Sequence, residues 1–247
     1  LDERSNQPMK FGDYIIVFNG EIFNYKELKN IVKADYKTNS DTEVIIKCVE
    51  SKGIDWFLDN ANGMFAFALY SFKAKQLFLC RDRFGIKPLF YSIVDNTLIF
   101  SSEVKGILNS GLVEAKFNFS KIEEYLSYRQ VFEPDTFFCD IFQVESATYL
   151  KFSQNLDISK FKYWSLPNTF NSDIYNEKEL TKKLKNKIID SVNLWAISDV
   201  NIGTFLSGGL DSSLTSAILS KSHKNLMTYT IGFKEKGYNE FYYADLV

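Results

Sequence analysis

The stretch FLSGGLDSS (residues 205–213) decides how the second half of this chain is understood. It follows a short apolar run and precedes a segment with helical periodicity. A strand that turns directly into a helix directs backbone N–H groups and the positive helix end toward a bound anion. Gly208 and Gly209 allow positive φ and the close approach of a ligand to the backbone. We therefore predict a phosphate-binding loop here, with a tight Gly-Gly turn capped by serines as the alternative.

The loop differs from two common nucleotide-binding motifs. No lysine lies between residues 206 and 220, whereas the P-loop of kinases and GTPases ends in Gly-Lys-Ser/Thr. The third glycine of the dinucleotide-binding fingerprint is also missing. Asp211 is unusual for an anion site, but its carboxylate suits a metal ion that bridges phosphates. These features favour a phosphate site of another kind.

The segments on either side of the loop predict a parallel sheet. Residues 201–206 and 226–233 have the composition of strands, and residues 210–221 have the periodicity of a helix. This order is typical of a βαβ unit that opens a doubly wound sheet. A longer helix is expected over residues 177–195, with Asn176 as its start signal. Its apolar residues share one helical face: Leu180, Leu184, Ile188, Val192 and Trp195.

The first half of the chain has a different pattern, rich in strands. Residues 63–102 contain four apolar strand segments separated by short polar connections. They predict consecutive antiparallel pairs in a sheet that is covered on both faces. A strand over residues 14–18 is expected to end at Asn19-Gly20, which is a turn signal.

Further elements are expected around these strands. Helices are predicted over residues 24–32 and 121–128, and strand structure returns within residues 137–152. Ser40 and Glu43 form a capping-box pattern at the start of another helix.

One charged cluster lies in a connection between two strands. Arg81, Asp82 and Arg83 precede Gly85. We predict a structural role for them, as a solvated face or as an ion-pair network, and no catalytic role.

Composition limits the classes of partner. The chain has 247 residues, of which 45% are hydrophobic, and 29 basic residues oppose 31 acidic ones, which gives a net charge of −2. Such a balance gives no electrostatic case for nucleic acid or an anionic membrane as the main partner. No apolar run approaches the roughly 18 residues of a membrane span. The three cysteines, Cys48, Cys80 and Cys139, have no metal-site or redox spacing, so a reducing cytoplasm is the expected compartment.

Two sets of motifs carry a family resemblance. SGGLDSS resembles the pyrophosphate-binding motif of the ATP-pyrophosphatase (PP-loop) synthetases, and DVNIGTFLSGGLDSS (residues 199–213) is similar to the synthetase domain of glutamine-hydrolysing asparagine synthetases. Six blocks of the first half resemble, in the family's order, its class II glutaminase domain: QPM, FNGEIFNY, SDTEVI, NGMFAFAL, RDRFGIKPLFY and FSSEVKGIL.

The resemblance implies an α/β protein of two domains. Residues 1–164 are expected to form an Ntn-type αββα sandwich with antiparallel sheets, which is the glutaminase domain. Residues 165–176 are the expected linker. Residues 177–247 are expected to begin the doubly wound parallel sheet of the ATP-pyrophosphatase domain.

The resemblance also assigns residues to the glutaminase site. It implies that Asn19 and Gly20 bind glutamine and provide the donors for a tetrahedral oxyanion. It implies that Glu21 and Asp41 hold the α-amino group of glutamine, since two acids suit a cation. From local sequence alone, Asn19-Gly20 could equally be a plain turn and Asp41 an acidic helix start.

A second set of residues is assigned to ATP. The resemblance implies that the loop surrounds pyrophosphate. It also implies that two residues border the nucleotide: the residue before the first serine of the loop, and a residue that ends the next strand. Asp211 is expected to take part in binding Mg²⁺. The implied ATP- and pyrophosphate-binding residues are Leu206, Ser207, Gly208, Gly209, Asp211, Ser212 and Ile231.

The chain also departs from the family pattern. The family's glutaminase nucleophile is an N-terminal cysteine, whereas residue 1 is Leu. The region after residue 176 is short for an α/β synthetase domain. We therefore expect an internal fragment that is inactive alone. Ser146-Ala147 stand where the family commonly has Pro-Gly, and Asn201 stands where proline is usual.

For the parent protein, the resemblance implies cytoplasmic, glutamine-hydrolysing asparagine synthesis. ATP and Mg²⁺ would activate aspartate, and glutamine-derived ammonia would attack it to give asparagine, AMP and pyrophosphate. The expected partners are these small molecules and a second copy in a homodimer, with no nucleic acid and no membrane. Two alternatives stay open: an amidotransferase or cyclase of the same fold that acts on another carboxylate (a sugar acid, a peptide or a β-lactam precursor), and a non-catalytic protein with a decayed glutaminase fold.

Overall fold

The computed structural model describes residues 3–168, 176–198, 200–235, 237 and 239–247. The chain separates into two compact units, Leu1–Asn168 and Thr169–Val247. Of the expected linker 165–176, residues 169–175 lie outside the described residues. Each unit is described by itself.

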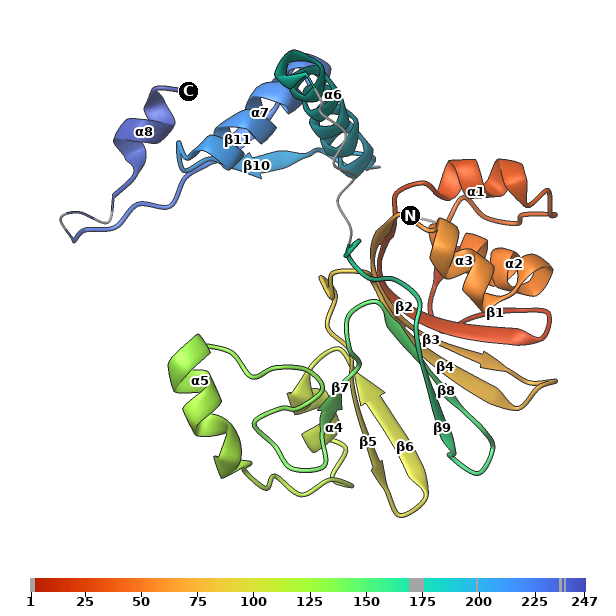
Figure 1. The fold of residues 1–247 in the computed structure, drawn as a ribbon. Helices are drawn as coiled ribbons and strands as arrows, with labels where there is room; N and C mark the ends of the chain where they lie inside the picture. The colour runs from red at the N-terminus through yellow and green to blue at the C-terminus, as the bar shows by residue number, and fades with distance from the viewer. Residues whose placement is uncertain (1–2, 169–175, 199, 236, 238) are drawn as a thin grey trace. The chain divides into compact units, whose positions relative to one another are not determined.

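The first unit is built on a six-stranded antiparallel sheet with the order β1-β2-β3-β4-β8-β9 (Figure 1). Its strands are β1 (Met9–Phe11), β2 (Tyr14–Ile22), β3 (Gly63–Ser71), β4 (Gln76–Arg81), β8 (Thr148–Phe152) and β9 (Ile158–Lys162). A short helical turn, η1 (Glu3–Ser5), precedes the sheet.

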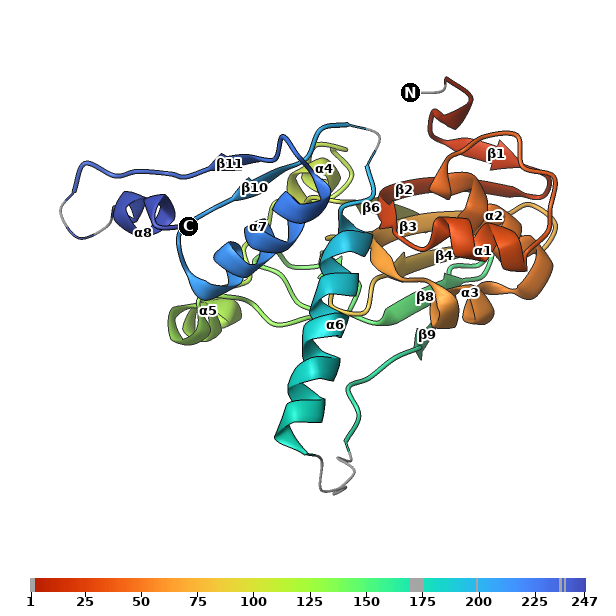
Figure 2. The ribbon, with the colours of Figure 1, turned by 90° about the horizontal axis from the view of Figure 1, so that it is seen from above.

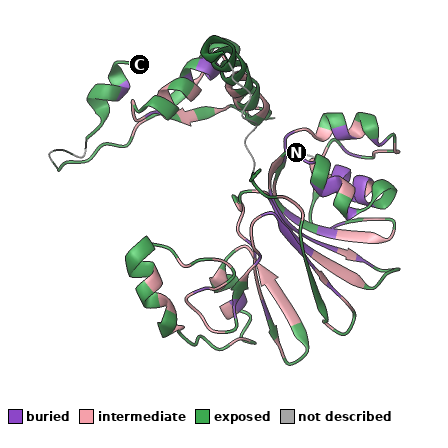
Figure 3. Cartoon of the chain, in the orientation of Figure 1, coloured by how far each residue is buried: buried purple, intermediate pink, exposed green. Residues whose placement is uncertain are grey.

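Three helices cover one face of this sheet, namely α1 (Tyr25–Ile31), α2 (Asp41–Lys52) and α3 (Ile54–Asn60). Residues of β2 alternate between the two faces, so that Ile16 and Phe18 point into the layer below the helices. There they join a core that includes Ile45 and Phe57. Figure 3 shows this burial concentrated in α2 and in the central strands.

A second, smaller antiparallel sheet packs on the other face. Its order is β6-β5-β7, and its strands are β5 (Phe90–Val94), β6 (Thr97–Ser101) and β7 (Phe142–Gln143). A separate apolar cluster joins Ala66, Leu79 and Phe152 of the large sheet to Leu98 and Phe100 of the small one. The remaining helical elements of the unit are α4 (Val104–Leu108), η2 (Phe119–Lys121) and α5 (Ile122–Tyr128).

This layering confirms the predicted fold class. Helices, sheet and sheet stack in order, and α4 contacts the strands of the second sheet. The predicted antiparallel pairs are right for β3–β4 and β5–β6. However, β4 and β5 belong to different sheets, because the connection between them crosses from one layer to the other.

The predicted turn at Asn19-Gly20 is wrong. Strand β2 continues to Ile22, and Asn19 and Gly20 pair with Ala66 and Phe65 of β3. Nine consecutive cross-strand pairs with β3 outweigh the local preference of Asn-Gly for a turn.

The predicted capping box is half right. Ser40 is the N-cap of α2, and its hydroxyl accepts a hydrogen bond from the N–H of Thr42 at 3.2 Å. Glu43 does not return to Ser40, because its carboxylate accepts hydrogen bonds from the N–H groups of Lys37 and Thr38. Glu43 is fully buried, so it fixes the approach to α2 from inside.

The second unit contains the predicted βαβ arrangement. Strands β10 (Gly203–Phe205) and β11 (Met227–Tyr229) pair in parallel, and α7 (Leu210–Ser222) connects them (Figure 2). Helix α6 (Glu177–Trp195) precedes this motif, and α8 (Phe241–Asp245) follows it. The start signal of α6 is confirmed, because the Asn176 side chain accepts a hydrogen bond from the N–H of Lys178 at 3.0 Å.

Two further features concern membrane-spanning helices and cysteines. Within the described ranges, no helix has the length and apolar character that crossing a membrane requires. Cys48, Cys80 and Cys139 are all free thiols, and the first two are buried.

Candidate functional site

The first candidate site lies on the outer edge of β2. In an antiparallel strand, the N–H groups of alternate residues point to the same side. The N–H of Phe18 donates to Oε1 of Gln7, and the N–H of Ile22 donates to Oδ2 of Asp41 at 2.9 Å. By the same alternation, the N–H of Gly20 faces this edge between them. β1 pairs with β2 only as far as Ile16, so this part of the edge lies beyond the last β1 pair.

Gly20 is required here by its backbone. Its φ of +149° is unfavourable for residues with a side chain, and an added Cβ would lie 2.1 Å from the carbonyl oxygen of Met64. The glycine therefore lets β2 and β3 approach closely while its N–H is directed at the edge.

Asn19, the residue before Gly20, provides a side-chain donor. It is exposed on the face of β2 opposite Phe18, and its Nδ2 donates to the hydroxyl of Ser102 at 3.3 Å. A side-chain amide and a main-chain N–H on adjacent residues are the donor types that stabilise an oxyanion.

Two carboxylates accompany these donors. Asp41 is the first residue of α2, so it is an acidic helix start and also a group at the end of β2. Burial raises the pKa of Asp41, while hydrogen bonds from Ile22, Thr42, its own N–H and Ser40 act in the opposite direction. Glu21 follows Gly20 on β2 and is exposed. The structure thus brings all four predicted residues to one end of β2.

The second candidate site is the loop before α7. Gly209 is the N-cap of this helix, and the first helical hydrogen bond runs from the N–H of Ser213 to its carbonyl oxygen. The N–H groups of residues 210–212 therefore precede the helical ladder and face the end of the helix. The hydroxyls of Ser207 and Ser212 lie 3.0 Å apart, and each also bonds to the loop backbone.

The two glycines of the loop differ in conformation. Gly208 has φ +77°, as predicted, whereas Gly209 has an ordinary φ of −70°. A Cβ at Gly208 would lie 2.3–2.5 Å from backbone atoms of Tyr243. The close approach that Gly208 permits is therefore made by helix α8 in this structure.

Leu206 and Ile231 lie at the ends of the two parallel strands. Leu206 is buried and donates its N–H to the carbonyl oxygen of Tyr229, while its own carbonyl accepts the hydroxyl of Thr230 at 2.6 Å. Ile231 is exposed two residues beyond the end of β11. Both lie on the side of the strands where the loop begins.

The residues present fit an anionic phosphate group. The hydroxyls of Ser207 and Ser212 and the free N–H groups of the first turn of α7 are donors suited to it. The hydroxyl of Ser213, in the same turn, is buried and has no hydrogen-bond partner in the described part of the chain. The sequence offers both serines of the repeated pair as hydroxyl donors. In the structure the Ser212 hydroxyl bonds to that of Ser207, whereas the Ser213 hydroxyl has no partner among the described residues.

One carboxylate of the loop region is a candidate metal ligand. Asp211 is exposed in the first turn of α7. Across the described residues, no group of three or more His, Cys, Asp and Glu side chains could hold a metal ion. A single carboxylate suits Mg²⁺ that is held mainly by phosphates and water.

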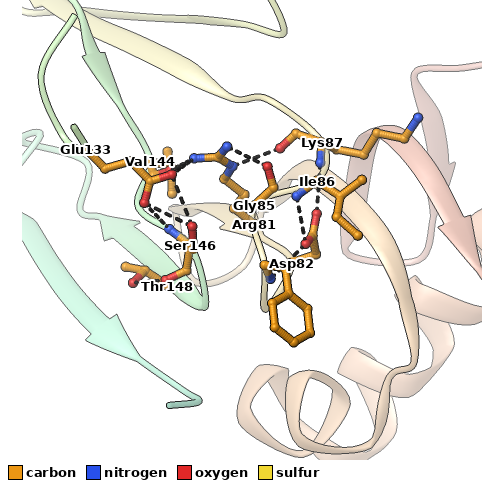
Figure 4. A network of polar contacts seen from close by, with 10 residues as sticks. Arg81, Asp82, Gly85, Ile86, Lys87, Glu133, Val144, Ser146 and Thr148 are labelled. Atoms are coloured by element: carbon orange, nitrogen blue, oxygen red, sulfur yellow. Dashed lines mark hydrogen bonds and ion pairs between the residues drawn. The ribbon is translucent and has the colours of Figure 1, made fainter. Parts of the chain in front are cut away.

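The charged cluster after β4 is a buried ion-pair network and not a solvated face (Figure 4). The Arg81 guanidinium donates to the carbonyl oxygens of Gly85, Lys87 and Val144 and to the carboxylate of Glu133. The Asp82 carboxylate accepts hydrogen bonds from four backbone N–H groups, those of Phe65, Phe84, Ile86 and Lys87. The cluster therefore holds the connection between the sheets, in agreement with the predicted structural role.

Comparison with known families assigns both parts of the chain to family models. The family model described as a glutamine amidotransferase domain matches residues 1–164, and the one described as asparagine synthase matches residues 183–247. The chain belongs to the glutamine amidotransferase family. With both matches it has the domain content of the glutamine-hydrolysing asparagine synthetases, which confirms the predicted resemblance.

Curated relatives point the same way. A protein of Methanocaldococcus jannaschii is 36% identical over 268 residues, which cover 100% of this chain and 51% of that protein. The asparagine synthetase [glutamine-hydrolyzing] 1 of Bacillus subtilis is 34% identical over 96% of this chain and 38% of its own length. The chain thus spans about half, or less, of the length of these relatives.

A solved structure supports the fold alone. An allosteric regulatory enzyme of purine biosynthesis superposes with a TM-score of 0.50 at 16% identity, over 95% of this chain and 49% of that one.

Proposed function

We propose that the full-length protein makes asparagine from aspartate, with ATP and with ammonia released from glutamine. The observation that carries this proposal is the pair of donors on the β2 edge. The N–H of Gly20 faces outward between two N–H groups that Gln7 and Asp41 occupy, and the preceding residue, Asn19, carries a side-chain amide donor. The family match and the relatives support the reaction class.

On the glutamine side, the chain's residues have distinct tasks. Attack on the glutamine amide creates a tetrahedral oxyanion, which Asn19 Nδ2 and the Gly20 N–H would stabilise. Asp41 and Glu21 would hold the α-ammonium group, which places the amide carbonyl toward the donors. The family's nucleophile is an N-terminal cysteine, and no residue of this chain is assigned to that role.

On the nucleotide side, the loop before α7 would hold pyrophosphate. The N–H groups of residues 210–212 and the hydroxyls of Ser207 and Ser212 are its donors. Gly208 and Gly209 shape the loop, and Leu206 and Ile231 would border the adenine. ATP, when bound, supplies the adenylyl group that activates the acceptor carboxylate.

Asp211 would help to hold Mg²⁺, which would supply positive charge next to the phosphates.

Residues 1–164 would then be the glutaminase domain, residues 165–176 the linker and residues 177–247 the first part of the synthetase domain. We place the protein in the cytoplasm, as a homodimer that acts on small molecules only. The three free cysteines fit a reducing compartment.

The test uses the full-length protein. Aspartate should stimulate exchange of labelled pyrophosphate into ATP, and glutamine should yield glutamate. If another carboxylic acid stimulates the ATP–pyrophosphate exchange and aspartate does not, the acceptor is that acid and the reaction class is unchanged. Absence of both activities would leave a non-catalytic protein and end the proposal.

A further inference from the structure

We propose that Ser102 is a positioning residue for the oxyanion site, because its hydroxyl orients the amide of Asn19. The inference rests on the proposed glutaminase function, and it adds a residue directly after strand β6, 83 positions away in the sequence.

The architecture brings Ser102 to Asn19. Asn19 pairs with Ala66, so both residues lie on the face of the large sheet that packs against the small sheet. Phe100 of β6 packs into that same interlayer cluster. Ser102 follows two positions later, directly after the last residue of β6. The Nδ2 of Asn19 donates to Ser102 Oγ at 3.3 Å across this gap.

The hydrogen bond has a chemical consequence. The terminal torsion of an asparagine side chain is broad and roughly two-fold, so an exposed amide can present either its oxygen or its nitrogen to a ligand. Only the nitrogen stabilises a negative oxygen. When Ser102 accepts one hydrogen of Nδ2, the amide is held with its nitrogen toward the site, and the second hydrogen is left for the oxyanion.

The neighbouring serine provides a matched control. Ser101 is the last residue of β6, and its hydroxyl has other partners than that of Ser102. Its hydroxyl accepts the N–H of Glu103 and lies against Gly106 of α4, where an added Cβ would be 2.3 Å away. Ser101→Ala therefore removes a hydroxyl from the same segment without touching Asn19.

The experiment compares glutamine hydrolysis by full-length wild type, Ser102→Ala, Ser102→Thr and Ser101→Ala. We expect Ser102→Ala to lower kcat by about three- to tenfold, the range for loss of one hydrogen bond, with KM changed less than about twofold. Ser102→Thr should restore kcat because it keeps the hydroxyl. Synthesis driven by added ammonium salt should be the same in all four proteins. Unchanged kcat in Ser102→Ala, or an equal loss in Ser101→Ala, would overturn the inference.

A crystal structure of the full-length Ser102→Ala variant gives a second readout that needs no activity. We expect the Asn19 side chain to occupy more than one orientation, whereas a single wild-type orientation would contradict the role of Ser102. Wild type that hydrolyses no glutamine would instead contradict the proposed function, so the two failures are distinguishable.

Discussion

Gly20 and Gly208 are positions where the backbone decides which residue is tolerated. Both have positive φ, and at each a Cβ would overlap main-chain atoms of another element. Neither glycine is in a free turn, although the sequence suggested one for Gly20. The space that each leaves is filled by protein, by β3 at Gly20 and by α8 at Gly208.

Gly20→Ala should destabilise the first unit and abolish glutamine hydrolysis. The Met64 carbonyl oxygen would lie 2.1 Å from the new methyl group, so β2 and β3 must separate locally. We expect a loss of at least about 2–3 kcal/mol in the free energy of unfolding, as for other overpacked sites. Urea denaturation measures it.

Gly53→Ala is the control for this substitution. Gly53 also has positive φ, at +90°, but no atom lies within 4 Å of an added Cβ. It should lose only about 1 kcal/mol. Equal losses in the two variants would show that backbone strain, and not the contact with Met64, determines the effect.

Ser146→Pro should be destabilising even though the family commonly has proline there. The N–H of Ser146 donates to Glu133 at 2.8 Å, and its hydroxyl bonds to the same carboxylate. Proline removes both donors beside the ion pair with Arg81. We expect a loss of about 2–3 kcal/mol, and about 1 kcal/mol for Ser146→Ala, which keeps the N–H. Thermal unfolding measures both losses. A proline variant as stable as the alanine variant would show that this N–H does not contribute to stability.

At the scale of elements, α2 joins the core to the candidate site. Its first residue, Asp41, reaches β2, and its buried face contains Cys48. Burial raises the pKa of the Cys48 thiol to about 12. The pKa of Tyr36 is also raised to about 12, mainly by burial and to a smaller extent by the charges of Cys48 and Glu43. Both groups keep their protons in the folded state at pH values where the unfolded chain loses them.

The sign of the resulting pH dependence follows directly. With the folded pKa above the unfolded one, the contribution to stability is complete below about pH 9 and declines as the pH rises toward 12. We expect the urea concentration at the midpoint of unfolding to fall as the pH rises through this window. In Cys48→Ala this midpoint should fall less steeply with pH. The same slope in wild type and Cys48→Ala would exclude the thiol as a cause. Urea titrations at pH 8, 9 and 10 are sufficient.

Element types were largely predictable, because periodicity and capping residues determine them locally. Ser40 and Asn176 mark helix starts in both sequence and structure. What failed depends on distant partners. The continuation of β2 through Asn19 requires β3, and the burial of Arg81 requires Glu133, which comes 52 residues later.

The candidate site was predictable only through the family resemblance. Locally, Asn19-Gly20 is a turn signal and Asp41 a helix start. No feature of the sequence links Ser102 to Asn19, because the contact depends on how two sheets stack. The edge pattern of N–H groups on β2 likewise appears only once the strand pairs are known.

At the scale of the whole molecule, two compact units carry separate donor sets. A substitution in one unit should therefore affect one half-reaction of the full-length protein. Gly208→Ala forces a methyl group against the backbone of Tyr243. We expect aspartate-dependent ATP–pyrophosphate exchange to fall by at least about 100-fold, the order of effect seen when active-site geometry shifts by about 1 Å. Glutamine hydrolysis should persist.

Gly209→Ala provides the comparison for folding. Its φ is negative, and its nearest neighbour is a side-chain oxygen of Ser207 at 3.3 Å. It should unfold at a higher urea concentration than Gly208→Ala. Loss of glutamine hydrolysis in Gly208→Ala would show that the two units do not respond independently.

The side chains that occupy the outer edge of β2 also limit what else can pair with that edge. An exposed strand edge is a template on which another chain can add a strand. Gln7 and Asp41 block this at two of the outward N–H groups, and each comes from outside the sheet. Two occupied N–H groups shorten the run of unpaired backbone, so this edge is a poorer template for a foreign strand than a bare edge would be.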